Sequence, residues 1–209
     1  MRKIQDAELQ DKKILLRVDF NVAVENGKVM EFFKIKAAQK TIDYILQKNG
    51  KVSLISHLGR PEGKKITEFS FAQIKSEIET CLGIKVDFIS DCIGNKVREG
   101  LESLEAGQVL FLENSRFYPG EEANDPNFSK MLAENFDIFV NDAFSVCHRD
   151  QASVTGVTKI LPSFAGFWLQ KEIENLDRIK NDPDRPAIAI IGGAKIETKL
   201  PLIKCFEKI

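Results

Sequence analysis

The stretch KILLRVDFN, from Lys13 to Asn21, starts as a continuous apolar run and ends on polar side chains. Apolar runs without alternation are typical of strands that are buried on both faces of a parallel sheet. Similar runs recur along the chain. The expected strands are Lys13–Val18, Val52–Ser56, Val86–Ile89, Val109–Leu112, Ile138–Val140 and Ala187–Ile191.

Helical patterns separate these runs. The expected helices lie near Ile35–Gln47, Phe71–Leu82, Asn95–Leu104, Phe128–Asn135 and Phe167–Ile179. Strands that alternate with helices at this spacing indicate right-handed βαβ units. The sequence therefore predicts an α/β fold, a doubly wound and mostly parallel Rossmann-like sheet with helices on both faces.

The segment KNDPDRP, from Lys180 to Pro186, interrupts this pattern. Two prolines and two aspartates so close together are typical of a linker or a domain boundary. After it the sequence predicts only one strand and one helix. The apolar face of that helix would carry Ile196, Leu200, Ile203 and Phe206.

Composition excludes several classes of function. The 209 residues are 43% hydrophobic and 29% charged, with a formal net charge of −1. This balance predicts a soluble globular protein without the basic field that nucleic acid or a membrane surface would attract. The apolar runs are too short to span a bilayer, and the charged N-terminus lacks the apolar core of a signal peptide.

The cysteines indicate a reducing compartment. Cys81, Cys92, Cys147 and Cys205 show neither CxxC nor metal-finger spacing. They are interpreted as reduced thiols of a cytoplasmic protein, and no metal site is expected.

Polar side chains gather where the predicted strands end, which is the edge at which open α/β sheets bind ligands. They are Asp19 and Asn21 after the first strand, His57 and Arg60 after the second, Arg116 after the fourth, and His148 and Arg149 after the fifth. The guanidinium fork binds phosphate or carboxylate oxygens in pairs. The pattern predicts a site for a small, multiply anionic ligand, with a hydroxyl or carboxylate that hydrogen-bonds to Asp19 and Asn21.

Simpler interpretations of the same residues stay open. Asp19 and Asn21 could shape a turn, as short polar side chains often do. Arg116 could pair with Glu121 or Glu122, and Arg149 with Asp150 or Asp142. Both histidines could be ordinary loop residues, which is the favoured interpretation for His148.

The closing stretch GGAKIETK, which begins at Gly192, would place a double glycine between a strand and a helix. Glycine permits close backbone approach, and a helix N-terminus attracts phosphate. Lys195 and Lys199 would share a helical face. The stretch lacks the spacing of a P-loop or a dinucleotide motif, so by itself an ordinary strand-to-helix turn explains it as well.

Six segments taken together resemble phosphoglycerate kinase over essentially the whole chain. They are LLRVDFNV, SHLGRPEG, LFLENSRFYPGEEANDPNFSKMLA, DIFVNDAF, HRDQAS and IAIIGGAKIETKL. The resemblance implies two Rossmann-like lobes joined by a hinge helix, the first holding phosphoglycerate and the second the nucleotide. It also implies phosphate transfer between 1,3-bisphosphoglycerate and Mg-ADP, which gives 3-phosphoglycerate and Mg-ATP in glycolysis.

The resemblance also implies roles for single residues. Asp19 and Asn21 would bind the glycerate portion, and Lys199 and Lys195 would contact the nucleotide phosphates or the group in transfer. The non-transferred phosphate would be held by His57, Arg60, Arg116 and Arg149.

The sequence departs from the family pattern at three positions. Lys34 stands where the family has an arginine that contacts the carboxyl end of the substrate and stabilises the phosphoryl group in flight. Lys34 and Lys199 are thus the expected catalytic residues, although lysine lacks the planar fork of arginine. Ala23 replaces a proline and Ser145 replaces a glycine.

The expected organisation follows from the same resemblance. Residues 1–166 would form the phosphoglycerate-binding lobe, 167–180 the hinge helix, 181–186 a linker, and 187–209 the start of a truncated nucleotide-binding lobe. The nucleotide pocket and its acidic groups for Mg²⁺ have no counterpart in the sequence, so the chain is expected to be inactive without that missing C-terminal lobe. A non-catalytic phosphoglycerate-binding module and a degenerate homolog remain the alternatives.

Overall fold

The computed structural model describes residues 1–105, 107–188, 190–191 and 200–206. The chain divides into two compact units, Met1–Leu169 and Gln170–Ile209. The helix α7 (Phe167–Asn181) crosses this division, and α8 (Leu200–Phe206) belongs to the second unit. The expected helix at Phe167–Ile179 is therefore confirmed as a helix.

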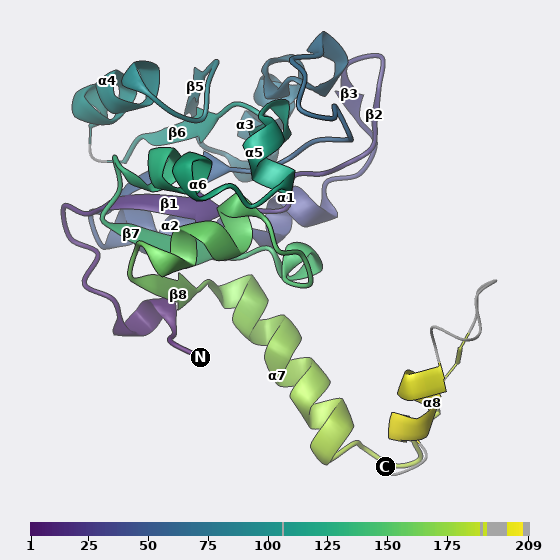
Figure 1. Cartoon of the computed structure of the whole chain (residues 1–209). Coiled ribbons are helices and arrows are strands. Elements are labelled where there is room, and N and C mark those ends of the chain that lie inside the picture. Colours follow the sequence, from purple (N-terminus) through teal and green to yellow (C-terminus); the bar gives the residue numbers. More distant parts are fainter. Residues whose placement is uncertain (106, 189, 192–199, 207–209) are drawn as a thin grey trace. The chain divides into compact units, whose positions relative to one another are not determined.

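The first unit is built on a six-stranded parallel sheet in the order β5-β6-β4-β1-β7-β8 (Figure 1). The strands are β1 (Lys13–Arg17), β4 (Lys51–Ile55), β5 (Val86–Ile89), β6 (Val109–Leu112), β7 (Ile138–Asn141) and β8 (Ser163–Ala165). Five of them confirm expected strands to within a residue at either end. The sequence reasoning missed β8, because three residues are too few to form a recognisable apolar pattern.

The strand expected at Ala187–Ile191 is wrong for the residues that the structure describes. Residues 187, 188, 190 and 191 adopt no strand, and Ala189 lies outside the described residues. Ile188 and Ile190 are 84% and 94% exposed. A strand needs a neighbour for its backbone hydrogen bonds, and an apolar sequence alone does not provide one.

The remaining helices of the first unit follow the predicted pattern with local differences. They are α1 (Phe33–Ala37), α2 (Gln39–Gln47), α3 (Lys75–Leu82), α4 (Asn95–Ser103), α5 (Pro119–Glu122) and α6 (Pro126–Ala133). The helix expected at Ile35–Gln47 is split at Ala38, whose N–H bonds to Ile35 in the tighter 3₁₀ manner. The helix expected at Phe71–Leu82 begins as a 3₁₀ turn.

A short hairpin, β2 (Val24–Glu25) with β3 (Lys28–Val29), lies between β1 and α1. Its turn residues Asn26 and Gly27 have φ of 51° and 73°. Asn-Gly is the preferred pair for a tight hairpin turn in which both central residues have positive φ. The sequence contains this turn signal, which the pattern of apolar runs does not reveal.

The core lies on both faces of the sheet. On one face Ile14 and Leu16 of β1 pack in a cluster with Ile42 of α2 and with residues of α1 and α3. On the other face Leu15 packs in a cluster with Leu132 of α6 and with residues of α4. Successive strand side chains point to opposite faces, so an unbroken apolar run needs helices on both sides. The predicted α/β architecture is confirmed (Figure 1).

Two further expectations concern thiols and membranes. Cys81, Cys92 and Cys147 are free thiols, and the side chain of Cys205 lies outside the described residues. Within the described ranges, no helix combines the length and the apolar character that crossing a bilayer requires.

Candidate anion-binding site

The predicted polar residues of the first unit come together at one edge of the sheet. They follow β6, β4, β1 and β7, which are consecutive neighbours in the sheet order. Parallel strands end at the same edge, so loops that are distant in sequence become adjacent there. The order of the strands thus brings together the loops that the sequence pattern predicted to lie at one edge of the sheet.

Arg17, the last residue of β1, is a buried member of the cluster. The sequence reasoning missed it. It is fully buried, and its Nη1 donates to the carbonyl oxygens of Val18 at 2.9 Å and Ile55 at 3.3 Å. Its Nη2 donates to Nδ1 of His57 at 2.9 Å. An arginine at the end of an apolar strand was the available signal, because a buried charge needs specific partners.

The contact with Arg17 determines the state of His57. A ring nitrogen that accepts a hydrogen bond carries no proton, so the proton of the imidazole lies on Nε2. Burial, together with the positive charges of Arg17 and Arg116, holds the pKa of His57 far below its usual value. His57 is therefore a neutral donor through Nε2–H, whereas His148 is an exposed loop residue.

Arg116 is only 2% exposed and is held by backbone on one side. Its Nη1 donates to the carbonyl oxygen of Gly59 at 2.8 Å. Its Nη2 lies 3.2 Å from Oε1 of Glu122, which confirms the predicted ion pair, but that contact lacks hydrogen-bond alignment. Nε and Nη2 of Arg116 are buried and have no hydrogen-bond partner within the described part of the chain. Glu121, the other candidate, instead accepts from the backbone and hydroxyl of Ser153.

Arg60 and Arg149 complete the group of cations. Burial lowers the pKa of Arg116, and the charges of Arg149 and Arg60 lower it further, so both guanidinium groups lie within electrostatic reach of Arg116. Arg60 is exposed, while Arg149 is half-buried and its Nε has no hydrogen-bond partner.

The acids considered as partners of Arg149 are engaged elsewhere. Asp150 accepts from Nδ2 of Asn124 at 2.7 Å, and Asp142 accepts from the backbone N–H of Trp168 at 2.8 Å.

Asp19 links three segments of the site. Its Oδ1 accepts from the backbone N–H of Asn21 at 3.1 Å, which confirms the predicted turn role. Its Oδ2 accepts from the hydroxyl of Ser145 at 2.6 Å and lies 3.2 Å from Nζ of Lys34. Nζ of Lys34 also donates to the carbonyl oxygen of Asn21 at 2.9 Å. Two positions that depart from the family pattern, Lys34 and Ser145, therefore meet on one oxygen atom.

Gly59 joins the loop after β1 to the loop after β6. Its N–H donates to Oδ1 of Asn21 at 2.9 Å, and its carbonyl oxygen accepts from Arg116. Its φ is +63°, and a Cβ at this position would lie 2.4 Å from the ring of Phe69. Only glycine fits such a backbone without strain. The glycine of SHLGR thus fixes both Asn21 and Arg116.

Glu113 and Asn114 hold the loop after β4 by hydrogen bonds. The sequence reasoning missed both residues. Glu113 accepts from the hydroxyl of Ser70 at 2.6 Å and from the backbone N–H of Phe71 at 3.0 Å. Asn114 donates to the carbonyl oxygens of Leu58 at 2.8 Å and Phe69 at 2.9 Å. Their position directly after a buried strand was the available signal.

The nucleotide-binding lysines expected at Lys195 and Lys199 lie outside the described residues. Across the part of the chain that the structure describes, no three His, Cys, Asp or Glu side chains are grouped so as to hold a metal ion.

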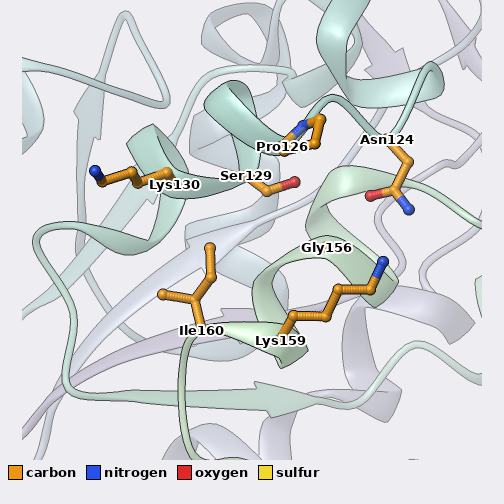
Figure 2. A pocket seen from close by; sticks show the side chains of 7 residues that line it. All are labelled: Asn124, Pro126, Ser129, Lys130, Gly156, Lys159 and Ile160. Carbon is orange, nitrogen blue, oxygen red and sulfur yellow. The ribbon is translucent and has the colours of Figure 1, made fainter.

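A separate pocket of about 430 Å³ involves α6 and the turns that follow Gln151 (Figure 2). It is lined by Asn124, Pro126, Ser129, Lys130, Gly156, Lys159 and Ile160. None of these is a predicted site residue, and none is an arginine. The pocket therefore does not belong to the arginine cluster.

The chain as a whole is similar to known proteins. A family model described as phosphoglycerate kinase matches residues 4–208. The phosphoglycerate kinase of Moorella thermoacetica is 48% identical over 96% of this chain and 51% of its own length, and that of Rubrobacter xylanophilus is 46% identical over 97% and 52%. The chain spans about half the length of these curated relatives.

Solved structures agree with the sequence relatives. The phosphoglycerate kinase of Coxiella burnetii superposes with a TM-score of 0.85 at 37% identity, over 97% of this chain and 51% of that one. The Pyrococcus horikoshii enzyme gives 0.86 at 33% identity, over 98% and 52%. With a family model along nearly its whole length, relatives at these identities and the same fold, this chain belongs to the phosphoglycerate kinase family.

Proposed function

We propose that this chain is the substrate-binding half of a phosphoglycerate kinase, which transfers phosphate between 1,3-bisphosphoglycerate and ADP to give 3-phosphoglycerate and ATP. One observation carries the proposal. Arg17, Arg116 and Arg149 each have a buried Nε that finds no hydrogen-bond partner among the described residues, and the same holds for Nη2 of Arg116. Buried charged donors without acceptors are unfavourable, and phosphate oxygens are the acceptors that match guanidinium groups.

Different residues of the site would bind different parts of the ligand. Arg60, Arg116 and Arg149 would hold the non-transferred phosphate, and the neutral His57 would add one donor through Nε2. The glycerate portion would lie against Asp19, Asn21 and Lys34. The side chain of Lys34 is 35% exposed, so its ammonium group can contact the carboxyl end of a ligand.

The nucleotide is assigned to other parts of the protein. The described residues offer no group of acids that fits the Mg²⁺ of Mg-ADP or Mg-ATP, so binding of that metal is not assigned to them. Lys195 and Lys199 would contact its phosphates, with Lys199 and Lys34 as the catalytic lysines. Phosphoryl transfer needs both anions and the metal held in line. The chain alone would thus bind phosphoglycerate weakly, bind Mg-ATP hardly at all, and show little turnover without a nucleotide-binding lobe.

The proposed organisation keeps residues 1–166 as the substrate lobe of a cytoplasmic enzyme. Residues 167–180 would form the hinge helix, 181–186 the linker, and 187–209 the start of the nucleotide lobe. The helical backbone at α7 and the exposed residues that follow it support this assignment.

Calorimetric titration of the purified chain tests the proposal. We expect heat of binding from 3-phosphoglycerate and almost none from Mg-ATP. Arg60→Ala should weaken binding by about 1.5–3 kcal/mol, the range for hydrogen bonds to charged groups. The matched control is Arg98→Ala, an exposed arginine on α4, which should bind as the wild type does.

Three results would contradict parts of the proposed function. A chain that binds no 3-phosphoglycerate refutes the substrate-lobe function. Rapid turnover by the chain alone would refute the need for a second lobe. Binding that never leads to turnover, even with a nucleotide lobe supplied, would favour the non-catalytic binding module.

A further inference from the structure

We propose that Ser145 is a positioning residue that orients Asp19, so that Asp19 and Lys34 together recognise the 2-hydroxyl and carboxylate of a 2-hydroxy acid. This inference rests on the proposed function and adds to it a determinant of specificity. Ser145 enters from the loop after β7, 126 positions along the chain from Asp19. It contributes a neutral hydroxyl beside the charged side chains of Asp19 and Lys34.

The first step is the count of acceptor positions on Asp19. Each carboxylate oxygen can accept about two hydrogen bonds. Oδ2 receives the Ser145 hydroxyl at 2.6 Å and forms an ion pair with Nζ of Lys34 at 3.2 Å, so two groups already engage this oxygen. Oδ1 receives the N–H of Asn21 at 3.1 Å and, among the described residues, no second hydrogen bond. Oδ1 is therefore the oxygen of Asp19 that is left to accept from a ligand.

The second step is the count of donors on Lys34. An ammonium group has three N–H donors. One is directed to the carbonyl oxygen of Asn21 at 2.9 Å, and the group also forms an ion pair with Asp19 at 3.2 Å. The cluster thus offers an acceptor and a cationic donor side by side. A 2-hydroxy carboxylate presents the complementary pair, a hydroxyl that donates and a carboxylate that accepts.

The third step is why Ser145 is needed. Without its hydroxyl, Oδ2 would regain a free position, and the carboxylate could turn to accept from water or from the ligand through either oxygen. The Asp19 side chain is 13% exposed, so water can reach it. Ser145 removes that alternative without adding a charge, because a hydroxyl is neutral. The expected consequence is discrimination for the hydroxyl of the ligand rather than for its phosphate.

Calorimetry with two ligands tests this role. The ligands are 3-phosphoglycerate and 3-phosphooxypropanoate, which is the same molecule without its 2-hydroxyl. Ser145→Ala should weaken binding of 3-phosphoglycerate about two- to tenfold, the range for one hydrogen bond. It should leave binding of 3-phosphooxypropanoate unchanged, and Ser145→Thr should restore the wild-type preference. Ser103→Ala, an exposed serine on α4, is the matched control and should change neither.

A double-mutant cycle tests the shared atom. Ser145→Ala and Lys34→Met both act through Oδ2 of Asp19, so their combined loss should differ from the sum of the single losses. Strict additivity would overturn the coupling. Equal weakening of both ligands by Ser145→Ala, with a lowered Tm, would reduce Ser145 to a structural role and overturn the inference.

The two proposals fail in different ways. If Arg60→Ala weakens 3-phosphoglycerate binding while Ser145→Ala has no effect on either ligand, the proposed function stands and the role of Ser145 is refuted. If the wild-type chain binds neither ligand, both are refuted.

Discussion

At the scale of single residues, the hydrogen bond from Arg17 to His57 makes a prediction about protonation. His57 should remain neutral, with its proton on Nε2, because burial and the surrounding cations lower its pKa. Nitrogen-15 NMR of the imidazole between about pH 7.5 and 5.5 should show that single tautomer, since an unperturbed histidine titrates near pH 6.5. An imidazolium pattern in this range would contradict the assignment. In Arg17→Met the pKa of His57 should rise, because one positive charge is removed.

At this scale the sequence predicted which side chains gather at one edge of the sheet, while the ligand that they would bind stays a prediction. Arginines after strands predicted the cluster at Arg60, Arg116 and Arg149, because few other roles need a planar cation at a sheet edge. Arg17 was missed, since its partners Ile55 and His57 are distant in the chain and only the sheet brings them close. Ser145 was noticed as a departure, but its contact with Asp19 depends on tertiary structure alone.

At the scale of elements, the start of α7 depends on one buried acid. Oδ1 of Asp142 accepts from the backbone N–H groups of Trp168 at 2.8 Å and Leu169 at 3.1 Å, which caps the helix. Burial raises the pKa of Asp142 to about 6, against opposing hydrogen bonds from Thr41 and these two amides. The native state then holds the proton more tightly than the unfolded chain, so stability falls as pH rises through this range.

This linkage predicts the behaviour of Asp142→Asn, which keeps the shape and one acceptor oxygen but cannot ionise. Relative to the wild type, the variant should gain stability as pH rises from about 4 to about 6, by about 2–3 kcal/mol in all. Urea unfolding at several pH values in this window measures the difference. Parallel curves for the two proteins would mean that Asp142 titrates normally.

The helices and strands show which features of the fold can be predicted from residues that are neighbours in the sequence. Five strands were predictable because burial on both faces of the sheet requires a continuous run of apolar residues, which is visible in the sequence. Pairing is not local, and this explains both β8, which was missed, and the strand expected at Ala187–Ile191, which the described residues do not form. The split at Ala38 was equally hidden, because its backbone stays helical and the change is confined to local hydrogen bonds of the 3₁₀ kind.

At the scale of the whole molecule, the apolar core lies within the first unit, Met1–Leu169. Residues 182–188, which follow α7, are mostly exposed. Thermolysin cuts before large apolar residues, so its first cuts should fall at Ile188 or Ile190, which are 84% and 94% exposed. The product that begins at Met1 should keep the Tm of the intact chain and its binding of 3-phosphoglycerate. A broad, non-cooperative melt of that product would show that the residues removed contribute to the core.

The guanidinium nitrogens without partners also affect how the stability of this protein is measured. An oxyanion that binds the native cluster, and not the unfolded chain, stabilises the fold by mass action, about 1.4 kcal/mol for each tenfold rise in concentration above its Kd. Phosphate and sulfate are then ligands rather than inert buffer components. On the proposed function, an unfolding free energy obtained in phosphate belongs to a complex, and only one obtained in an amine buffer belongs to the free protein.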